Sequence, residues 1–420
     1  MKIMKLKKRT AAGVFAALLL LATWLNTVGC SMNANAADLM EGIRAGNVTG
    51  KQADAAFISE SANFAIELLQ STAEKDTNTT ISPLSVMLAL AMTANGAAGE
   101  TKKQMEEILG GDIPLETLNE YLYAYIKALP SEDSSKLQIA NAVWFRDSMN
   151  VSRDFLQKNA DYFQANAYRS AFDEQTVRDI NKWVKDKTDG TIEKIIEGDT
   201  IDAAAMMYLI NALSFDAEWE NVYEKTDIRA GIFHTANGAE QSVEMMCSTE
   251  YGYIDDGRAT GFIKPYKGNH YSFAALLPNE DISLDAYISS LNGDSFVKSI
   301  ENAKANREAV WSTMPKFSYD TELELREALS AMGMAAVFDS QKADFSKISE
   351  DDLYVNQVLH KTHISVDELG TKAGAVTAEI MLGAAFIENT VTLDRPFLYA
   401  IIDNATNLPV FMGTVTNFEG

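Results

Sequence analysis

The sequence predicts an α+β fold, built as one large domain. Helical patterns come first along the chain, many strand-like runs follow, and one helix returns late, in TELELREALSAMG (321–333). This order favours an α+β domain over the repeated βαβ units of a parallel sheet. No internal repeat or Pro/Ser-rich linker interrupts the chain after Phe57. We therefore expect a tether at residues 30–54 and a single domain at residues 55–420.

Four helical segments are expected in the first half of the chain. Apolar residues recur at helical spacing in the segments 57–74 and 99–110. Ser82 is a typical N-cap residue and Pro83 a typical first helical residue, so a helix should begin there. The segment 176–190 is amphipathic. The apolar residues of its inner face are Val177, Ile180, Trp183 and Val184.

Most of the remaining chain reads as strands. Runs of strand length that are rich in apolar and β-branched residues favour β-structure. Short strands should alternate with turns from about Asp227 to Pro278. The other strand-like runs are 137–145, 206–215, 354–368, 396–403 and 408–418.

Residues 1–29 have the features of a signal peptide. Basic residues precede the apolar run 11–25, which is too short for a comfortable membrane span. TVGC (27–30) resembles a bacterial lipobox, in which Cys30 would be lipidated. The alternative is ordinary cleavage after ANA (34–36). Both alternatives predict export, with the protein either lipid-anchored at the cell envelope or secreted.

The composition restricts the partners that we expect. The net charge of −23 argues against nucleic acid, heparin-like polyanions and anionic membrane surfaces, so a membrane would be contacted only through an N-terminal lipid. Cys30 and Cys247 are the only cysteines, which excludes a disulfide framework. Stability must therefore come from burial.

The sequence carries no pattern of an enzyme site. It has no HExxH metal motif, no GxSxG nucleophile elbow and no Cys/His cluster. His360 and His363 are an odd number of residues apart in one predicted strand, so they should point to opposite faces. We therefore expect no catalytic activity, no metal and no cofactor.

Eight motifs, in order, resemble those of the serpin family. Each is a weak signal alone, but their order and spacing cover nearly the whole chain after the leader. They are NTTISPLS (78–85), GAAGET (96–101), INKWVKDKTDGTI (180–192), LINALSFDAEW (209–219), MPKFS (314–318), ALSAMGM (328–334), ELGTKAGAVT (368–377), and RPF (395–397) with PVFMGTVTNF (409–418).

This resemblance implies a single monomeric domain with three β-sheets, eight or nine helices and an exposed reactive-centre loop at about residues 369–390. It also implies a suicide-substrate mechanism. A target serine protease, or a cysteine protease, attacks the loop and forms an acyl-enzyme. The loop then inserts into the main sheet as a new strand and traps the enzyme.

The hinge of this loop has side chains that suit both the exposed loop and the strand inserted in the sheet. Side chains alternate between the faces of a strand, and the inward face here carries small residues. Gly370 supplies flexibility where the turn starts. Glu379 falls on the same inward face, where a carboxylate without a partner is unfavourable, so it counts against easy insertion. The implied hinge residues are Glu368, Gly370, Thr371, Ala373, Ala375 and Thr377.

The family's loop length places the reactive bond at Ala384 and Ala385. In another register Met381 or Leu382 would precede the bond. Small residues at this position suit elastase-like or subtilisin-like proteases. No Arg or Lys lies between residues 373 and 394, which disfavours trypsin-like targets.

Two polar clusters are also implied by the resemblance. The shutter lies under the main sheet where its strands part, and the breach lies at the top of the sheet where the loop enters. The shutter residues are Ser82, Asn211 and His360, and the breach residues are Trp219, Lys316 and Glu368.

Two other functions compete with protease inhibition. One is a non-inhibitory serpin used for storage, folding assistance or ligand carriage, although the small hinge residues disfavour it. The other is a lipid-anchored binding protein, which fits the leader but would require βαβ repeats that the sequence lacks.

Overall fold

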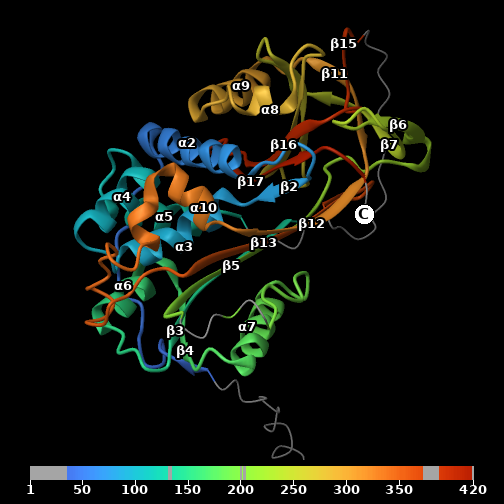
Figure 1. The fold of residues 1–420 in the computed structure, drawn as a ribbon. Coiled ribbons are helices and arrows are strands. Elements are labelled where there is room, and N and C mark those ends of the chain that lie inside the picture. Colours follow the sequence, from blue (N-terminus) through green and yellow to red (C-terminus); the bar gives the residue numbers. More distant parts are fainter. Residues whose placement is uncertain (1–35, 131–134, 199–200, 202–204, 372–386, 419–420) are drawn as a thin grey trace, which may run out of the picture. The chain divides into compact units, whose positions relative to one another are not determined.

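Three β-sheets form the framework of the protein in the computed structural model (Figure 1). The structure describes residues 36–130, 135–198, 201, 205–371 and 387–418. Within these ranges it has nine α-helices, which confirms the predicted α+β class. None of the helices in these ranges is long and apolar enough to span a membrane.

The largest sheet has seven strands, in the order β1-β4-β3-β5-β14-β13-β12. Strands β5 and β13 run parallel and pair directly as far as Leu213 and Thr362. Beyond that point the short strand β14 lies between them, antiparallel to both. The bounds are β1 (Ala37–Asp38), β4 (Asn166–Ser170), β3 (Ser135–Arg146), β5 (Met207–Glu218), β14 (Gly370–Thr371), β13 (Gln357–Val366) and β12 (Phe317–Glu324).

The two smaller sheets lie beside the upper part of this framework (Figure 1). One has six strands: β2 (Thr79–Ile81), β17 (Pro409–Val415), β16 (Phe397–Asp403), β10 (Tyr271–Pro278), β9 (Ala259–Pro265) and β8 (Tyr253–Asp255). The other has four strands: β15 (Asn389–Thr392), β11 (Ala309–Pro315), β7 (Glu240–Tyr251) and β6 (Ile228–His234).

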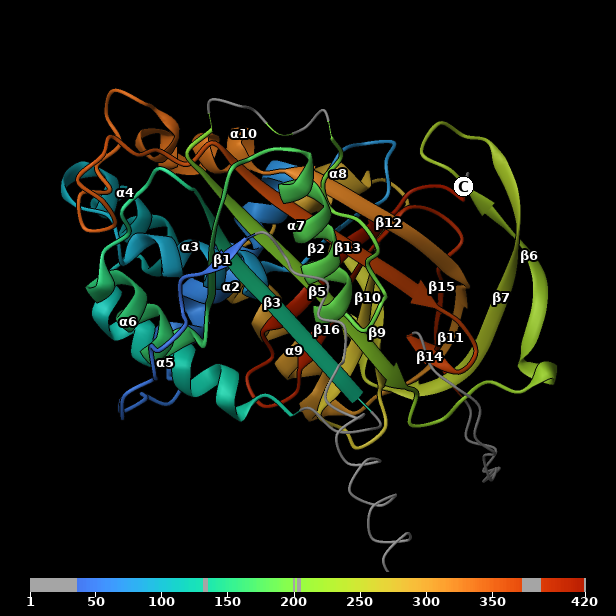
Figure 2. The same ribbon diagram turned by 90° about the horizontal axis from the view of Figure 1, so that it is seen from below.

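Helices cover both faces of the seven-stranded sheet (Figures 1 and 2). One of them, α7, packs on one face over a small core around Trp144, Trp183 and Tyr208. A much larger core fills the other side, beneath α2 and α3. The helices are α2 (Ala55–Thr72), α3 (Pro83–Ala94), α4 (Gly99–Gly110), α5 (Leu115–Ala128), α6 (Arg153–Phe163), α7 (Glu174–Lys187), α8 (Leu284–Ile288), α9 (Gly293–Asn306) and α10 (Arg326–Leu329).

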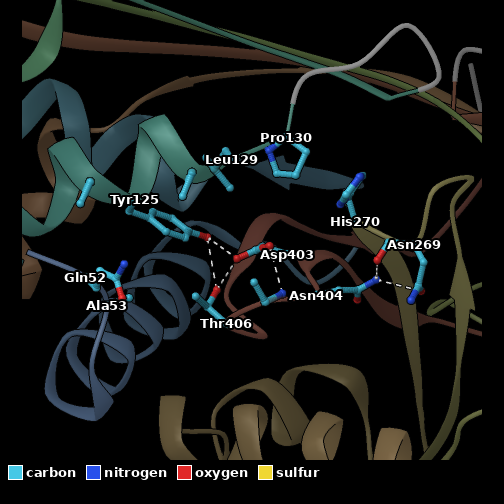
Figure 3. Close-up of a pocket in the computed structure, with 13 residues that line it drawn as sticks. Gln52, Ala53, Tyr125, Leu129, Pro130, Asn269, His270, Asp403, Asn404 and Thr406 are labelled. Atoms are coloured by element: carbon cyan, nitrogen blue, oxygen red, sulfur yellow. Dashed lines mark hydrogen bonds between the residues drawn. The ribbon is translucent and has the colours of Figure 1, made fainter.

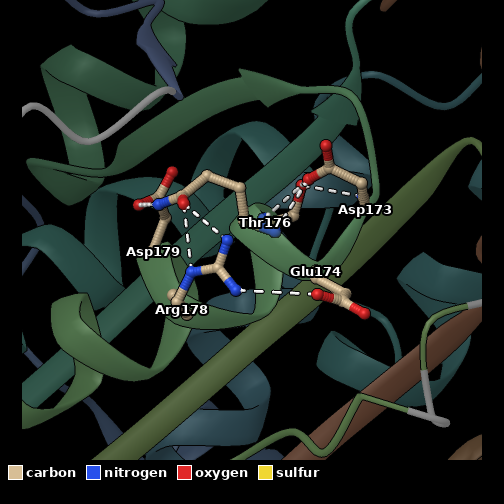
Figure 4. Close-up of polar contacts among 6 residues, drawn as sticks. Asp173, Glu174, Thr176, Arg178 and Asp179 are labelled. Carbon is tan, nitrogen blue, oxygen red and sulfur yellow. Dashed lines mark hydrogen bonds and ion pairs between the residues drawn. The ribbon is translucent and has the colours of Figure 1, made fainter.

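Local sequence explains where two of these helices begin. Helix α3 starts at Pro83, and the Ser82 side chain accepts a hydrogen bond from the Ser85 backbone N–H, as predicted. Helix α7 starts with a capping box between Asp173 and Thr176 (Figure 4). These caps satisfy backbone N–H groups that a helix leaves without partners in its first turn.

The predicted late helix at 321–333 is wrong at its start. Strand β12 continues to Glu324, and α10 begins only at Arg326. Alternation continues through this region, because Thr321 is buried and both Glu322 and Glu324 are exposed. These residues have helical propensity, but the alternation of buried and exposed side chains is that of a strand, and they form a strand.

The chain before α2 contacts the sheet. Ala37 and Asp38 pair antiparallel with Arg169 and Tyr168, so β1 forms an edge strand beside β4. The Leu39 backbone N–H also donates to the carbonyl of Ala167 at 2.9 Å. Part of the segment expected to be a tether is thus hydrogen-bonded to the domain.

Candidate functional site

The candidate site is the place where the chain leaves β13 and turns back into the sheet. Residues 367–369 form the turn, after which Gly370 pairs with Glu218 and Thr371 with Ala217. The approach is close, because a Cβ atom on Gly370 would lie 2.0 Å from the carbonyl oxygen of Ala217. Glycine is therefore required for this pairing.

Aromatic rings bury the end of this segment. The Trp219 ring stacks on the Tyr266 ring, with centroids 4.5 Å apart. The Tyr266 hydroxyl lies 2.6 Å from the Thr371 hydroxyl, and Thr371 is only 2% exposed. Burial raises the pKa of Tyr266 far above its usual range, so the phenol is neutral and can donate this hydrogen bond.

Backbone hydrogen bonds hold the turn itself. The carbonyls of Asp367, Glu368 and Leu369 accept, in order, from the Trp219 indole N–H, the Tyr223 backbone N–H and the Trp219 backbone N–H. Each of these bonds is 2.9 Å long. We call these three hydrogen bonds the carbonyl clasp. The clasp fixes three successive residues against the end of β5.

Lys316 and Glu368 form an ion pair on the outside of the turn, at 2.8 Å. Lys316 also lies 3.4 Å from Glu244. The hydrogen bond from Lys316 lowers the pKa of Glu368 below its usual value. The two side chains are 22% and 36% exposed, so solvent screens the pair. The structure thus brings Trp219, Lys316 and Glu368 together.

Ser82, Asn211 and His360 also meet, lower in the sheet. His360 Nε2 accepts from the Ser82 backbone N–H at 3.0 Å, so the ring proton lies on Nδ1 and is donated to Asn211 Oδ1 at 2.5 Å. Asn211 in turn donates to Ser85 and Asn141. Burial lowers the pKa of His360 to about 3, which keeps the ring neutral. The cluster supplies hydrogen bonds inside an apolar layer.

His363 points away from this cluster. Its Nδ1 lies 2.7 Å from Asp320 on the exposed side of β13, whereas His360 is buried. Strand alternation therefore separates the two histidines, as predicted.

The other predicted site residues lie outside the described part of the chain. They include three hinge positions, the reactive bond and its alternatives, and the lipidation site. They are Cys30, Ala373, Ala375, Thr377, Glu379, Met381, Leu382, Ala384 and Ala385. The chain returns to the four-stranded sheet at β15, which runs parallel to β11.

Several residues at the breach have no counterpart among the predicted ones. Tyr223 and Tyr266 contact the turn and Thr371, and Lys264 and Glu250 form a buried ion pair beneath them. A lone Lys in the apolar run Phe262–Pro265 is an unusual signal, but it does not reveal its partner.

A separate cavity of about 730 Å³ lies between the end of α5 and two turns of the six-stranded sheet (Figure 3). Alanines, Leu129 and Pro130 form its apolar side. Its polar side includes Asp403, which accepts hydrogen bonds from Thr406 at 2.6 Å and Tyr125 at 3.3 Å. The volume of the cavity and its mixed apolar and polar lining are typical of a pocket that binds a small molecule.

Comparisons with known proteins agree with this geometry. The family described as Serpin (serine protease inhibitor) matches residues 59–418. Plasminogen activator inhibitor 1 of Bos taurus is 30% identical over 379 residues, which cover 87% of this chain and 93% of that protein. A serpin-like protein of Methanosarcina acetivorans is 30% identical over 369 residues, 85% of each chain.

Solved serpin structures also resemble this chain. The native state of tengpin, a thermophilic serpin, is 52% identical with a TM-score of 0.87, and the match covers 91% of this chain and 99% of tengpin. Human thyroxine-binding globulin has a TM-score of 0.77 at 24% identity, covering 87% of this chain and 99% of the globulin, so that likeness concerns the fold alone. This chain belongs to the serpin family.

Proposed function

We propose that this protein inhibits serine proteases by inserting its reactive-centre loop into the seven-stranded sheet. One observation carries the proposal. Gly370 and Thr371 already occupy the first positions of a strand between β5 and β13, which pair directly only below Leu213 and Thr362. Separation of these two strands would let the next residues continue the same strand.

The composition of the loop supports insertion. Thr371 faces the buried Tyr266 hydroxyl, so residues at every second position after it would enter the same side of the sheet. The first three of these residues are small, namely Ala373, Ala375 and Thr377. The fourth is the carboxylate Glu379, which opposes insertion.

The target class follows from the reactive bond. With Ala384 or Ala385 before the bond, the loop fits proteases that have shallow pockets, such as elastase-like or subtilisin-like serine proteases. Incubation with elastase, subtilisin and trypsin, followed by denaturing electrophoresis, tests this. We expect a covalent complex with one of the first two enzymes. Complete degradation by every protease, with no complex, would contradict the proposal.

Ligand carriage is the second candidate, because of the cavity beside α5 (Figure 3). A small amphipathic molecule would place its apolar part against Leu129 and a hydrogen-bonding group near Asp403 and Asn404. Thermal shift assays with amphipathic amines test this function. Ala128→Trp, which fills the cavity, should abolish any shift and leave protease trapping unchanged.

We also propose export through the leader, with Cys30 as the lipid attachment site. Cys30→Ser should then move the protein from the membrane fraction to the medium. A mature wild-type N-terminus at Ala37 would instead support secretion without a lipid.

A further inference from the structure

A buried ion pair lies directly beneath the breach. Lys264 Nζ, from β9, is 2.8 Å from Glu250 Oε1, from β7, and the two side chains are 1% and 6% exposed. The pair therefore links the six-stranded sheet to the four-stranded sheet. Burial alone would lower the pKa of Lys264, but the charge of Glu250 and contact with Tyr223 raise it above its usual value. The ammonium group stays charged in the interior.

This pair contacts the residues that form the carbonyl clasp. Lys264 Nζ lies 4.3 Å from the centroid of the Tyr223 ring and 5.4 Å from that of Trp219. At such distances an ammonium group attracts an aromatic face. The Ser248 hydroxyl lies 2.6 Å from Glu250 Oε1 and 3.2 Å from the Tyr223 hydroxyl, which extends the link on the other side.

The buried charges restrict how far these rings can move. Replacement of a buried ion pair by apolar residues is often neutral or stabilising, so the pair is not explained by stability alone. Any shift of Tyr223 or Trp219 would change the surroundings of a desolvated ammonium group, which is unfavourable. The same two residues donate all three hydrogen bonds of the clasp.

We propose that Lys264 and Glu250 are positioning residues that keep the carbonyl clasp closed in the intact protein and thereby delay loop entry. They act through Tyr223 and Trp219, whose ring centroids lie 4.3 Å and 5.4 Å from the Lys264 ammonium group. Delay of loop entry rests on the proposed inhibitory function, whereas control of the clasp does not.

The test is hydrogen exchange in the intact protein, which needs no protease. In the double variant Lys264→Met/Glu250→Leu no buried charge is left unpaired, so the domain should fold. The backbone amides of Trp219 and Tyr223 should exchange at least tenfold faster, while amides in the middle of β10 and β16 keep their rates. Glu250→Gln preserves side-chain shape but leaves the Lys264 ammonium group buried without its counter-charge, so it should speed exchange at these two amides at least as much as the double variant does. The matched control is Lys361→Gln/Glu322→Gln, which removes an exposed pair of β13 and β12 and should change none of these rates.

Unchanged exchange at Trp219 and Tyr223 in both variants would overturn the proposal. A uniform change across all sheets would also overturn it, since that result indicates a purely structural pair. As a second measurement, the intact double variant should convert at least tenfold faster than wild type to a form with a protease-resistant loop. Covalent trapping of a protease by the wild-type protein tests the proposed inhibitory function separately. Failure of the clasp proposal can therefore be distinguished from failure of the inhibitory function.

Discussion

The hydroxyl groups of Tyr266 and Thr371 lie 2.6 Å apart in the interior, although 105 residues separate them in the chain. Tyr266 stacks on Trp219, and Trp219 holds two carbonyls of the turn that leads to Thr371. The start of the hinge is therefore held at two places. The Tyr266 hydroxyl holds Thr371, and the indole and backbone N–H groups of Trp219 hold the turn before it. Four predictions test this arrangement and the properties that depend on it.

Tyr266→Phe should loosen the hinge without unfolding the protein. The change removes one buried hydrogen bond, which contributes about 1 kcal/mol to the free energy of unfolding. The Thr371 amide should then exchange faster. Tyr287→Phe is the control, because it removes a hydrogen bond to Asp256 far along the chain from the hinge and should leave Thr371 protected. Equal exchange at Thr371 in both variants would contradict the prediction.

Thr371→Arg should convert the protein from an inhibitor into a substrate. Thr371 is already buried beside Tyr266 in the intact protein, so a long charged side chain there should push Gly370 and residue 371 out of the sheet and oppose entry of the rest of the strand. The variant should fold and be cleaved, with a loss of covalent complex of at least tenfold. The control is Lys372→Glu, because strand alternation predicts that residue 372 of an inserted strand would face solvent, and this variant should trap protease as wild type does. Trapping by both variants would argue against insertion along this face.

Cleavage of the loop should raise the melting temperature strongly. The intact protein forgoes the hydrogen bonds of a further strand between β5 and β13. Roughly ten such bonds, at about 1 kcal/mol each with the associated burial, would exceed the whole stability of many domains. Calorimetry of intact and loop-cleaved protein measures this difference. Equal melting temperatures would remove the insertion mechanism.

Acid should destabilise the protein through His360. Its pKa is about 3 in the folded state and about 6.5 in the unfolded state, so between these values only the unfolded state binds the proton. Stability is therefore fully present above pH 6.5 and falls as the pH drops toward 3, by up to about 1.4 kcal/mol per pH unit. Denaturant titrations at several pH values test this. His360→Gln should show a shallower slope, and an identical slope would contradict the assignment.

Much of this arrangement is visible in the sequence, because it depends on local pattern. The N-cap at Ser82 follows from residue type, and the opposite directions of His360 and His363 follow from their spacing. The family resemblance implies a cluster of Trp219, Lys316 and Glu368, and the structure brings these residues together.

Other features could not be predicted from local pattern. Lys264, Glu250 and Tyr223 meet where strands of different sheets cross, so no spacing in the sequence relates them. Helices α5, α6, α8 and α9 also have no counterpart among the predicted segments. At 321–324 the helical and strand patterns compete, and pairing with β13 decides the outcome.

The position of β1 has a consequence for how a tethered molecule would be oriented. Ala37 pairs with Arg169 at the end of the sheet where β5 begins, near Met207, whereas the loop enters where β5 ends, near Glu218. A strand of that length spans roughly 40 Å. If a lipid on Cys30 holds the protein at a surface, the chain joins the sheet at the end nearer that surface, whereas the hinge residues Gly370 and Thr371 lie at the opposite end of the sheet.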